Sequence, residues 1–274
     1  MIPRANITAW RAQAPWALDE QVEQDLVLSR ALSEMFARPA LREMLAFRGG
    51  TALHKLFFDP PGRYSEDLDF VQVKAGPIKP VLLEVKEALD GWLGPPSSRQ
   101  VADSVKLFYG FETTAQPVRR IRVKIEINTR EHFAVERLHH VSFDVRNPWY
   151  AGTTPVTTYV LEELMATKLR ALYQRRKGRD LYDLWLALET LSPDEERVVA
   201  GFRAHLEHGG LCVSRAQYEA NMTQKLASAD FRNDVMPLLR DGSGYDVDQA
   251  FGLVHARLIA RIPGEPWKGL PQWL

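Results

Sequence analysis

The sequence predicts an α+β fold: a mixed β-sheet domain with flanking helices over residues 1–155, followed by a mainly α-helical domain over residues 156–274. Two observations lead to this prediction. Apolar and polar side chains alternate in residues 120–128, as in a half-buried strand, whereas residues 158–173 repeat apolar side chains at helical spacing. Between them, the segment 147–155 contains prolines and a glycine, which mark the expected boundary.

The first part of the chain begins with a less regular pattern. Residues 1–17 carry two prolines and two tryptophans and predict an irregular arm, whereas residues 19–36 predict an amphipathic helix with Asp19 as its N-cap. Periodicity and breaker residues then predict a short apolar strand at 44–47, helices at 81–93, 158–173, 179–188 and 193–208, a strand or strand pair at 101–114, a strand at 120–128, and helices from Ser214 and over 246–261.

The composition is that of an ordinary globular protein, with 45% hydrophobic and 26% charged residues. The 35 basic and 35 acidic residues give a formal charge of zero, so binding of nucleic acid would need a local basic patch. The single cysteine cannot form an internal disulfide, and no apolar run approaches the roughly 18 residues of a membrane span. These features predict a cytoplasmic protein that does not associate with membranes.

A pair of aspartates in the segment YSEDLDF is the first candidate catalytic site. Because side chains alternate along a strand, Ser65, Asp67 and Asp69 share one face, and the apolar residues between and after them share the other. Two carboxylates so spaced are suited to Mg²⁺, or to Mn²⁺, which take oxygen ligands and leave room for substrate phosphates. The alternative is that both aspartates face solvent on an edge strand.

The segment before it predicts a phosphate-binding turn. Gly49 and Gly50 follow the apolar strand, and a helix is expected to begin at Thr51. Without Cβ atoms, a phosphate can approach the backbone N–H groups at a helix N-terminus, and the Thr51 hydroxyl adds a further donor. The glycines would alternatively serve the geometry of a tight turn alone. The patterns GxGxxG and GxxxxGK[ST] are both absent, which excludes the Rossmann and P-loop cradles.

The order of these elements, a strand, Gly-Gly-Thr, a helix and a DxD strand, resembles the DNA polymerase beta-type nucleotidyltransferase superfamily. The segments FRGGTALHK and RYSEDLDF are similar to the AbiEii/AbiGii (MenT-like) family of nucleotidyltransferase toxins from abortive-infection and toxin–antitoxin systems. This resemblance implies a nucleotidyltransferase fold, a nucleoside triphosphate as substrate and a divalent metal. It also implies that Thr51 and Ser65 contact the triphosphate.

Residues 120–128 supply a candidate for a third acid. Four aliphatic side chains lie on one face of this strand, and Lys124 and Glu126 lie on the other, which could simply be solvated. The resemblance implies that Glu126 completes the metal-binding set with Asp67 and Asp69 and helps to activate the acceptor hydroxyl. In the same interpretation Lys124 meets phosphate oxygens.

A basic segment in the second part forms another candidate site. Its twelve residues contain Lys168, Arg170, Arg175, Arg176, Lys177 and Arg179, with no acidic residue among them. Lys168 lies close to the apolar stripe of its helix, which indicates that its ammonium points into a cleft. Asp180 and Asp183 follow on one helix face, where they could anchor Arg179 or hold Lys168. A solvated helix face followed by a basic loop is the alternative.

The resemblance assigns roles to this segment as well. Lys168 and Arg179 would contact the nucleotide, and either Asp180 or Asp183 would be the essential acid of the motif. The remaining basic residues would hold the backbone of an RNA acceptor, namely Arg170, Arg175, Arg176 and Lys177.

The predicted function is Mg²⁺-dependent transfer of a nucleoside monophosphate from an NTP to an acceptor, with a tRNA 3′ end as first choice. Such tRNA modification would serve phage defence by abortive infection. The resemblance further implies a cognate antitoxin, of the winged-helix DNA-binding type. Two other functions stay open: transfer to a protein side chain (AMPylation), and a catalytically inactive binding module acting through a partner.

Overall fold

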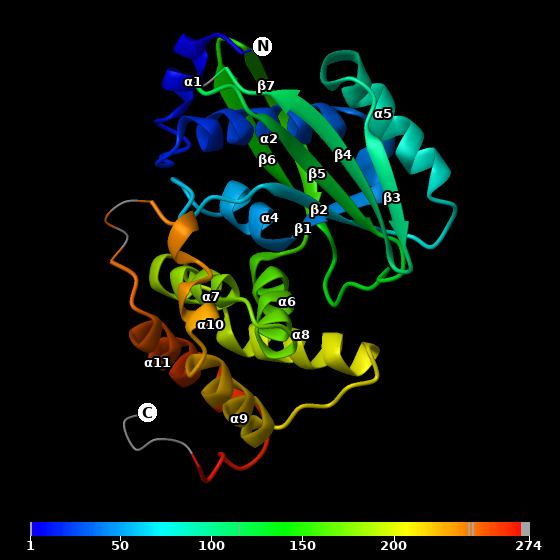
Figure 1. Cartoon of the computed structure of the whole chain (residues 1–274). Helices are drawn as coiled ribbons and strands as arrows, with labels where there is room; N and C mark the ends of the chain where they lie inside the picture. Colours follow the sequence, from blue (N-terminus) through cyan, green and yellow to red (C-terminus); the bar gives the residue numbers. More distant parts are fainter. Residues whose placement is uncertain (1, 115, 241, 243, 270–274) are drawn as a thin grey trace. The chain divides into compact units, whose positions relative to one another are not determined.

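The computed structural model describes residues 2–114, 116–240, 242 and 244–269. The chain consists of two compact units, Met1–Tyr159 and Val160–Leu274 (Figure 1). The first contains a sheet with flanking helices, and the second consists of helices, so the structure confirms the predicted α+β class.

The described part of the first unit contains a mixed seven-stranded sheet with the order β3-β4-β5-β2-β1-β7-β6. Two neighbouring pairs are parallel, β1 with β7 and β2 with β5, and the other pairs are antiparallel. The elements are α1 (Arg4–Trp10), α2 (Asp19–Ala37), α3 (Pro39–Met44), β1 (Leu45–Arg48), α4 (Gly49–Leu56), β2 (Asp67–Gln72), α5 (Lys79–Leu93), β3 (Ser97–Val101), β4 (Ser104–Glu112), β5 (Arg120–Asn128), β6 (His139–Asn147) and β7 (Tyr150–Thr158).

The apolar face of the sheet forms the core of this unit. In β2, Leu68 and Phe70 alternate with the two aspartates and are buried. The ring of Phe70 lies 5.2 Å from that of Phe47 in β1 and 5.9 Å from that of Phe36 in α2. Burial of each such side chain contributes roughly 1.5–3 kcal/mol. The packing of this face therefore leaves Asp67 and Asp69 on the opposite one.

Two expectations for the N-terminal region are wrong. Residues 4–10 form a helix, α1, because Trp10 is buried and its indole N–H donates to Asp25 of α2 over 2.9 Å, a tertiary contact that the local pattern does not reveal. Asp19 is the first residue of α2 and not its N-cap, which is Leu18. The carboxylate of Asp19 instead accepts a hydrogen bond from Arg11.

β5 spans Arg120–Asn128 as expected. Of the two alternatives for the 101–114 segment, the structure shows the long strand, β4, which pairs with β3, a strand at Ser97–Val101 that the pattern does not predict. The two strands that follow β5 were not expected. The predicted helix from residue 158 begins at Leu161, because β7 continues to Thr158, which pairs with Phe47 of β1.

The structure of the second unit confirms that this part of the chain is mainly helical. On α6 the predicted apolar stripe is buried, including Leu164, Leu169 and Leu172. The Ser214 hydroxyl and the Gln217 side chain form the predicted capping box at the start of α9. The elements are α6 (Leu161–Gln174), α7 (Gly178–Thr190), α8 (Glu195–His208), α9 (Arg215–Leu226), α10 (Ala229–Asn233), η1 (Met236–Leu238), α11 (Val247–Arg257) and η2 (Ile259–Arg261).

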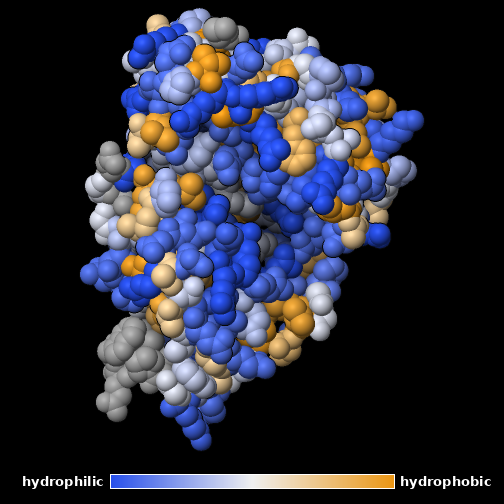
Figure 2. All heavy atoms as spheres, in the orientation of Figure 1, coloured by the Kyte–Doolittle hydropathy of each residue, from blue (hydrophilic) through white to orange (hydrophobic). Residues whose placement is uncertain are grey.

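The surface is largely polar on the side shown in Figure 2, where hydrophobic residues occur in small groups between hydrophilic ones. Within the part of the chain that the structure describes, no helix combines the length and the apolar character needed to cross a membrane.

Candidate active site

The turn between β1 and α4 brings backbone close to a carboxylate. Gly49 has a positive φ of 82°, and a Cβ built on it would lie 2.9 Å from Oδ2 of Asp69. Arg48, just before it, lies opposite Asp69 in the antiparallel pair of β1 and β2. A side chain at position 49 would therefore meet both backbone strain and a steric clash. This glycine allows Asp69 to lie against the start of α4.

Thr51 joins the start of α4 to the start of β2. Its side chain is buried, and its hydroxyl lies 2.6 Å from the Ser65 hydroxyl and donates to the carbonyl of Asp67. The structure thus brings Gly49, Thr51 and Ser65 together beside the two aspartates. The hydroxyl contacts of Thr51 show that it also fixes the position of the DxD strand.

The three predicted acids lie on neighbouring strands. In the parallel pair of β2 and β5, Asp67 lies opposite Lys124 and Asp69 lies opposite Glu126. Because residues that face each other across a ladder point to the same side, all four belong to one face of the sheet. Lys124 Nζ lies 2.9 Å from Asp67 Oδ2 and 3.1 Å from Glu126 Oε2. The expectation that Glu126 lies on a strand adjacent to the aspartates is confirmed.

Glu126 has further partners on β4. The Ser104 hydroxyl donates to Oε1 over 3.0 Å, and Lys106 Nζ lies 3.1 Å from Oε2. Both residues were missed in the sequence. Their alternation with buried Val105 and Leu107 places them on a polar face, but only the register of β4 against β5 shows that this face meets Glu126.

The charges on this face shift the pKa values of its groups. Burial raises the pKa of Asp69, and the charge of Asp67 raises it further, against smaller opposite effects of Lys124 and Arg48. For Glu126, burial acts against ionisation, but hydrogen bonds from Lys106 and Lys124 outweigh it and lower the pKa. Burial similarly opposes the charge of Lys124, yet its hydrogen bond to Asp67 and the surrounding carboxylates raise its pKa. Glu126 is therefore ionised at neutral pH.

The donor set fits a hard divalent cation at the two aspartates. They offer carboxylate oxygens of the type that Mg²⁺ and Mn²⁺ prefer. Burial and, after it, the charge of Asp67 raise the pKa of Asp69, and a bound cation would oppose both effects. Among the described residues, no group of three or more His, Cys, Asp or Glu side chains is arranged to hold a metal ion. In this structure Glu126 instead binds Lys106 and Lys124.

A second cluster lies within the helical unit. Lys168 Nζ lies 3.0 Å from Asp180 Oδ1 and 2.8 Å from Asp183 Oδ2, and both carboxylates are fully buried. Of the two arrangements considered for these aspartates, the structure shows that they hold Lys168. Burial opposes the charge of Asp180, but Lys168 and Arg175 lower its pKa. Arg179 is not anchored by them, because its guanidinium binds Asp234 over 2.9 and 3.1 Å.

The basic run is partly neutralised by these pairs. Arg175 forms two hydrogen bonds with Asp180, of 2.6 and 2.7 Å, and Lys177 lies 3.3 Å from Asp234. Arg176 is exposed and Arg170 is half-buried. Asp234 was missed in the sequence analysis, because nothing in its local pattern links it to a segment 55 residues earlier. These ion pairs therefore offset part of the positive charge that the composition of the run suggests.

Comparison with known protein families matches residues 30–252 to the model described as "Nucleotidyl transferase AbiEii toxin, Type IV TA system". The chain belongs to the AbiEii family. It is therefore a nucleotidyltransferase of a toxin–antitoxin family, as the resemblance of its motifs implied. The matched range contains both the acidic face of the sheet and the Lys168 cluster.

Solved structures share the fold of this AbiEii protein. MenT4, a nucleotidyltransferase toxin from Mycobacterium tuberculosis, is similar with a TM-score of 0.67 and 20% identity, covering 96% of this chain and 91% of that one. JHP933 from Helicobacter pylori is similar with a TM-score of 0.56 and 16% identity, covering 88% of this chain and 90% of the other. A comparison with curated proteins finds no match.

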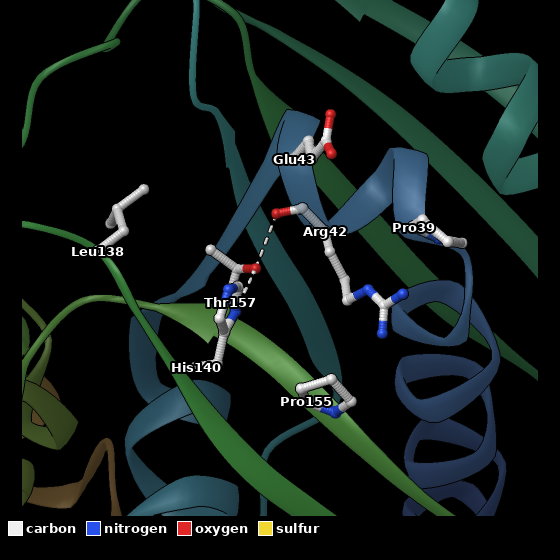
Figure 3. Close-up of a pocket in the computed structure, with 7 residues that line it drawn as sticks. All are labelled: Pro39, Arg42, Glu43, Leu138, His140, Pro155 and Thr157. Carbon is white, nitrogen blue, oxygen red and sulfur yellow. Dashed lines mark hydrogen bonds between the residues drawn. The ribbon is translucent and has the colours of Figure 1, made fainter.

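A pocket of about 520 Å³ lies elsewhere in the first unit of this AbiEii protein (Figure 3). It is lined by residues of α3, β6 and β7 and by Leu138, and none of the predicted site residues belongs to the lining. The Thr157 hydroxyl in this pocket donates to the carbonyl of Arg42 over 2.8 Å and lies 3.1 Å from Nδ1 of His140. These contacts join β7 to α3 and β6, so the Thr157 hydroxyl serves the fold.

Proposed function

We propose that this AbiEii protein transfers a nucleoside monophosphate from an NTP to the 3′ end of an RNA, with tRNA as the preferred acceptor, and that Mg²⁺ or Mn²⁺ is required. The observation that carries the proposal is the pairing of Asp69 with Glu126 across β2 and β5, with Gly49 directly against Asp69. This arrangement supports the proposal because the glycine turn lies beside Asp69, whose strand neighbours are Asp67 and Glu126.

In this proposal Asp67 and Asp69 hold the metal, which would neutralise charge on the triphosphate. The backbone N–H groups of Gly50 and Thr51 lie in the first turn of α4 and bind phosphate oxygens. The acceptor hydroxyl oxygen forms a bond to the α-phosphorus, the bond to the bridging oxygen breaks, and pyrophosphate leaves. Glu126, which is ionised, orients the hydroxyl and receives its proton or passes it to water. Such chemistry depends on positioning and electrostatic stabilisation.

The helical unit enters the proposal through Lys168. We assign its ammonium to phosphate oxygens of the nucleotide, and we assign Asp180 and Asp183 to holding that ammonium in place. The exposed members of the basic run contact the RNA backbone, in particular Arg176 and Lys177. The match to a toxin–antitoxin family supports a cognate antitoxin, for which we propose the winged-helix type. We further propose that the protein acts on RNA in the cytoplasm.

The test is transfer of label from each of the four α-labelled NTPs to total cellular RNA and protein in the presence of Mg²⁺. Label at tRNA 3′ ends is expected, and Asp67→Asn should abolish it. Glu66→Gln is the matched control, because Glu66 lies in the same segment but is exposed and outside the strand. Label on protein alone would replace the RNA acceptor by a protein, and absence of label with every NTP would indicate a binding module.

A further inference from the structure

Lys124 is the centre of the acidic face. It lies opposite Asp67 in the ladder of β2 and β5, and its ammonium contacts Asp67 Oδ2 at 2.9 Å and Glu126 Oε2 at 3.1 Å. Its side chain is half-buried. A positive charge of the protein itself is thus already bound to a carboxylate that the proposed function assigns to a metal ion.

The two carboxylates depend on Lys124 to different degrees. Glu126 has other partners, Lys106 and the hydroxyl of Ser104. Among the described residues, Lys124 is the one cation that an ion pair joins to Asp67. Removal of the ammonium would therefore leave Glu126 paired but would leave Asp67 without its counter-charge.

We propose that Lys124 is a resident counter-ion that competes with the divalent cation for Asp67 and, once displaced, becomes available to the triphosphate. This inference rests on the proposed function, because it requires Asp67 to be a metal ligand. A lysine ammonium is a compact charge on a flexible four-carbon stem, which allows it to exchange one anionic partner for another. The ammonium and the metal ion repel each other, so metal alone binds weakly and metal with nucleotide binds well.

The competition gives Lys124 two effects of opposite sign. Removing its charge should strengthen the binding of metal ion alone, because the competitor for Asp67 is gone. The same change should weaken the binding of nucleotide, because the triphosphate loses a partner. A lysine that serves only as a phosphate ligand would show the second effect without the first.

The experiment measures Mn²⁺ binding without nucleotide, by electron paramagnetic resonance titration, in the full chain. Lys124→Met should bind Mn²⁺ on the order of tenfold more tightly than the wild type, the scale on which one neighbouring charge shifts an ionic equilibrium. Lys124→Gln should show the same direction and serves as a second variant if the first folds poorly. Lys106→Met is the matched control, because Lys106 binds Glu126 from β4 without an ion pair to Asp67; its Mn²⁺ affinity should stay within about twofold of the wild type.

Binding of a non-hydrolysable NTP analogue in the presence of Mn²⁺ provides the second measurement, and Lys124→Met should weaken it. Equal Mn²⁺ affinities for the wild type and both Lys124 variants, with binding lost in Asp67→Asn, would overturn the inference and leave the proposed metal site intact. Mn²⁺ binding unchanged in both Asp67→Asn and Asp69→Asn would overturn the proposed site and the inference with it.

Discussion

Gly49 and Asp69 are in such close contact that a single added carbon would separate them, since a Cβ on Gly49 would lie 2.9 Å from Asp69 Oδ2. The positive φ of Gly49 adds backbone strain for any other residue. The position of the Asp69 carboxylate and the conformation of the turn at Gly49 therefore depend on each other.

Gly49→Ala should consequently damage both stability and transfer. We expect a loss of roughly 2 kcal/mol in the free energy of unfolding, from strain and displacement of Asp69. Transfer should fall at least tenfold, because the carboxylate moves by a fraction of an ångström. Gly91→Ala in α5 is the control: no heavy atom lies within 4 Å of its added Cβ, so it should stabilise by about 0.5–1 kcal/mol. Urea unfolding and transfer assays on both variants decide the matter.

Asp67→Asn should abolish nucleotide transfer while the protein stays folded. The substitution keeps the shape of the side chain but removes the charge that the proposed metal requires. Far-UV circular dichroism and the melting temperature should remain close to those of the wild type, and Glu66→Gln should retain activity. Transfer by Asp67→Asn at the wild-type rate in Mg²⁺ would refute the assignment of this carboxylate.

Asp69 and Asp180 should respond to pH in opposite ways in the metal-free protein. The pKa of Asp69 is raised on folding, so the native state holds its proton more tightly than the unfolded state. Its ionisation therefore lowers stability as pH rises through the interval above the ordinary Asp value. Asp69→Asn should be more stable than the wild type at pH 7, and the difference should vanish in acid. Unfolding curves from pH 3 to 7 test this.

The pKa of Asp180 is lowered on folding, so its contribution to stability is present above the ordinary Asp value and is lost as pH falls through the folded value. Asp180→Asn removes the buried carboxylate that Lys168 and Arg175 share and leaves Asp183 as the buried counter-charge of Lys168, and it should cost about 3 kcal/mol at pH 7. The penalty should shrink in acid. A penalty that stays constant from pH 3 to 7 would show that packing, and not charge, sets the effect.

The sequence predicts the strand at 120–128 because its alternation is complete, but it conceals β6 and β7. Residues 147–155 contain Pro148, Gly152 and Pro155, which are turn signals elsewhere. Pro155 lies opposite Ser142 in the antiparallel pair of β6 and β7, and on the other side β1 pairs with β7 only at Thr158, so Pro155 has no ladder partner in β1. The pairing of strands within the sheet stabilises β6 and β7, and the local sequence pattern does not encode that pairing.

The sequence likewise predicts only part of the candidate site. The spacing of Asp67 and Asp69 makes them candidates, and the superfamily order of elements adds Glu126, which the structure places opposite Asp69 on the neighbouring strand. Lys106 and Asp234 could not be predicted, because each joins the site through a partner that is distant in sequence. Pairing across strands and between helices is set by tertiary packing, which a single sequence does not specify.

Lys168 provides the sharpest test of the helical unit. Its ammonium lies between two buried aspartates, so Lys168→Ala should lose about 3 kcal/mol of stability in addition to activity, and its effect on transfer alone is ambiguous. Lys168→Arg avoids this ambiguity, because a guanidinium keeps the charge that both carboxylates need. We expect this variant to stay folded, with a melting temperature above that of Lys168→Ala, yet to transfer nucleotide roughly a hundredfold more slowly, since its larger planar group cannot replace a compact ammonium at a phosphate oxygen. Arg203→Lys, which also conserves charge, is the control and should retain transfer, because Arg203 is exposed on α8 and lies outside the basic run. Full activity in Lys168→Arg would show that the lysine supplies charge to the fold and takes no part in the reaction.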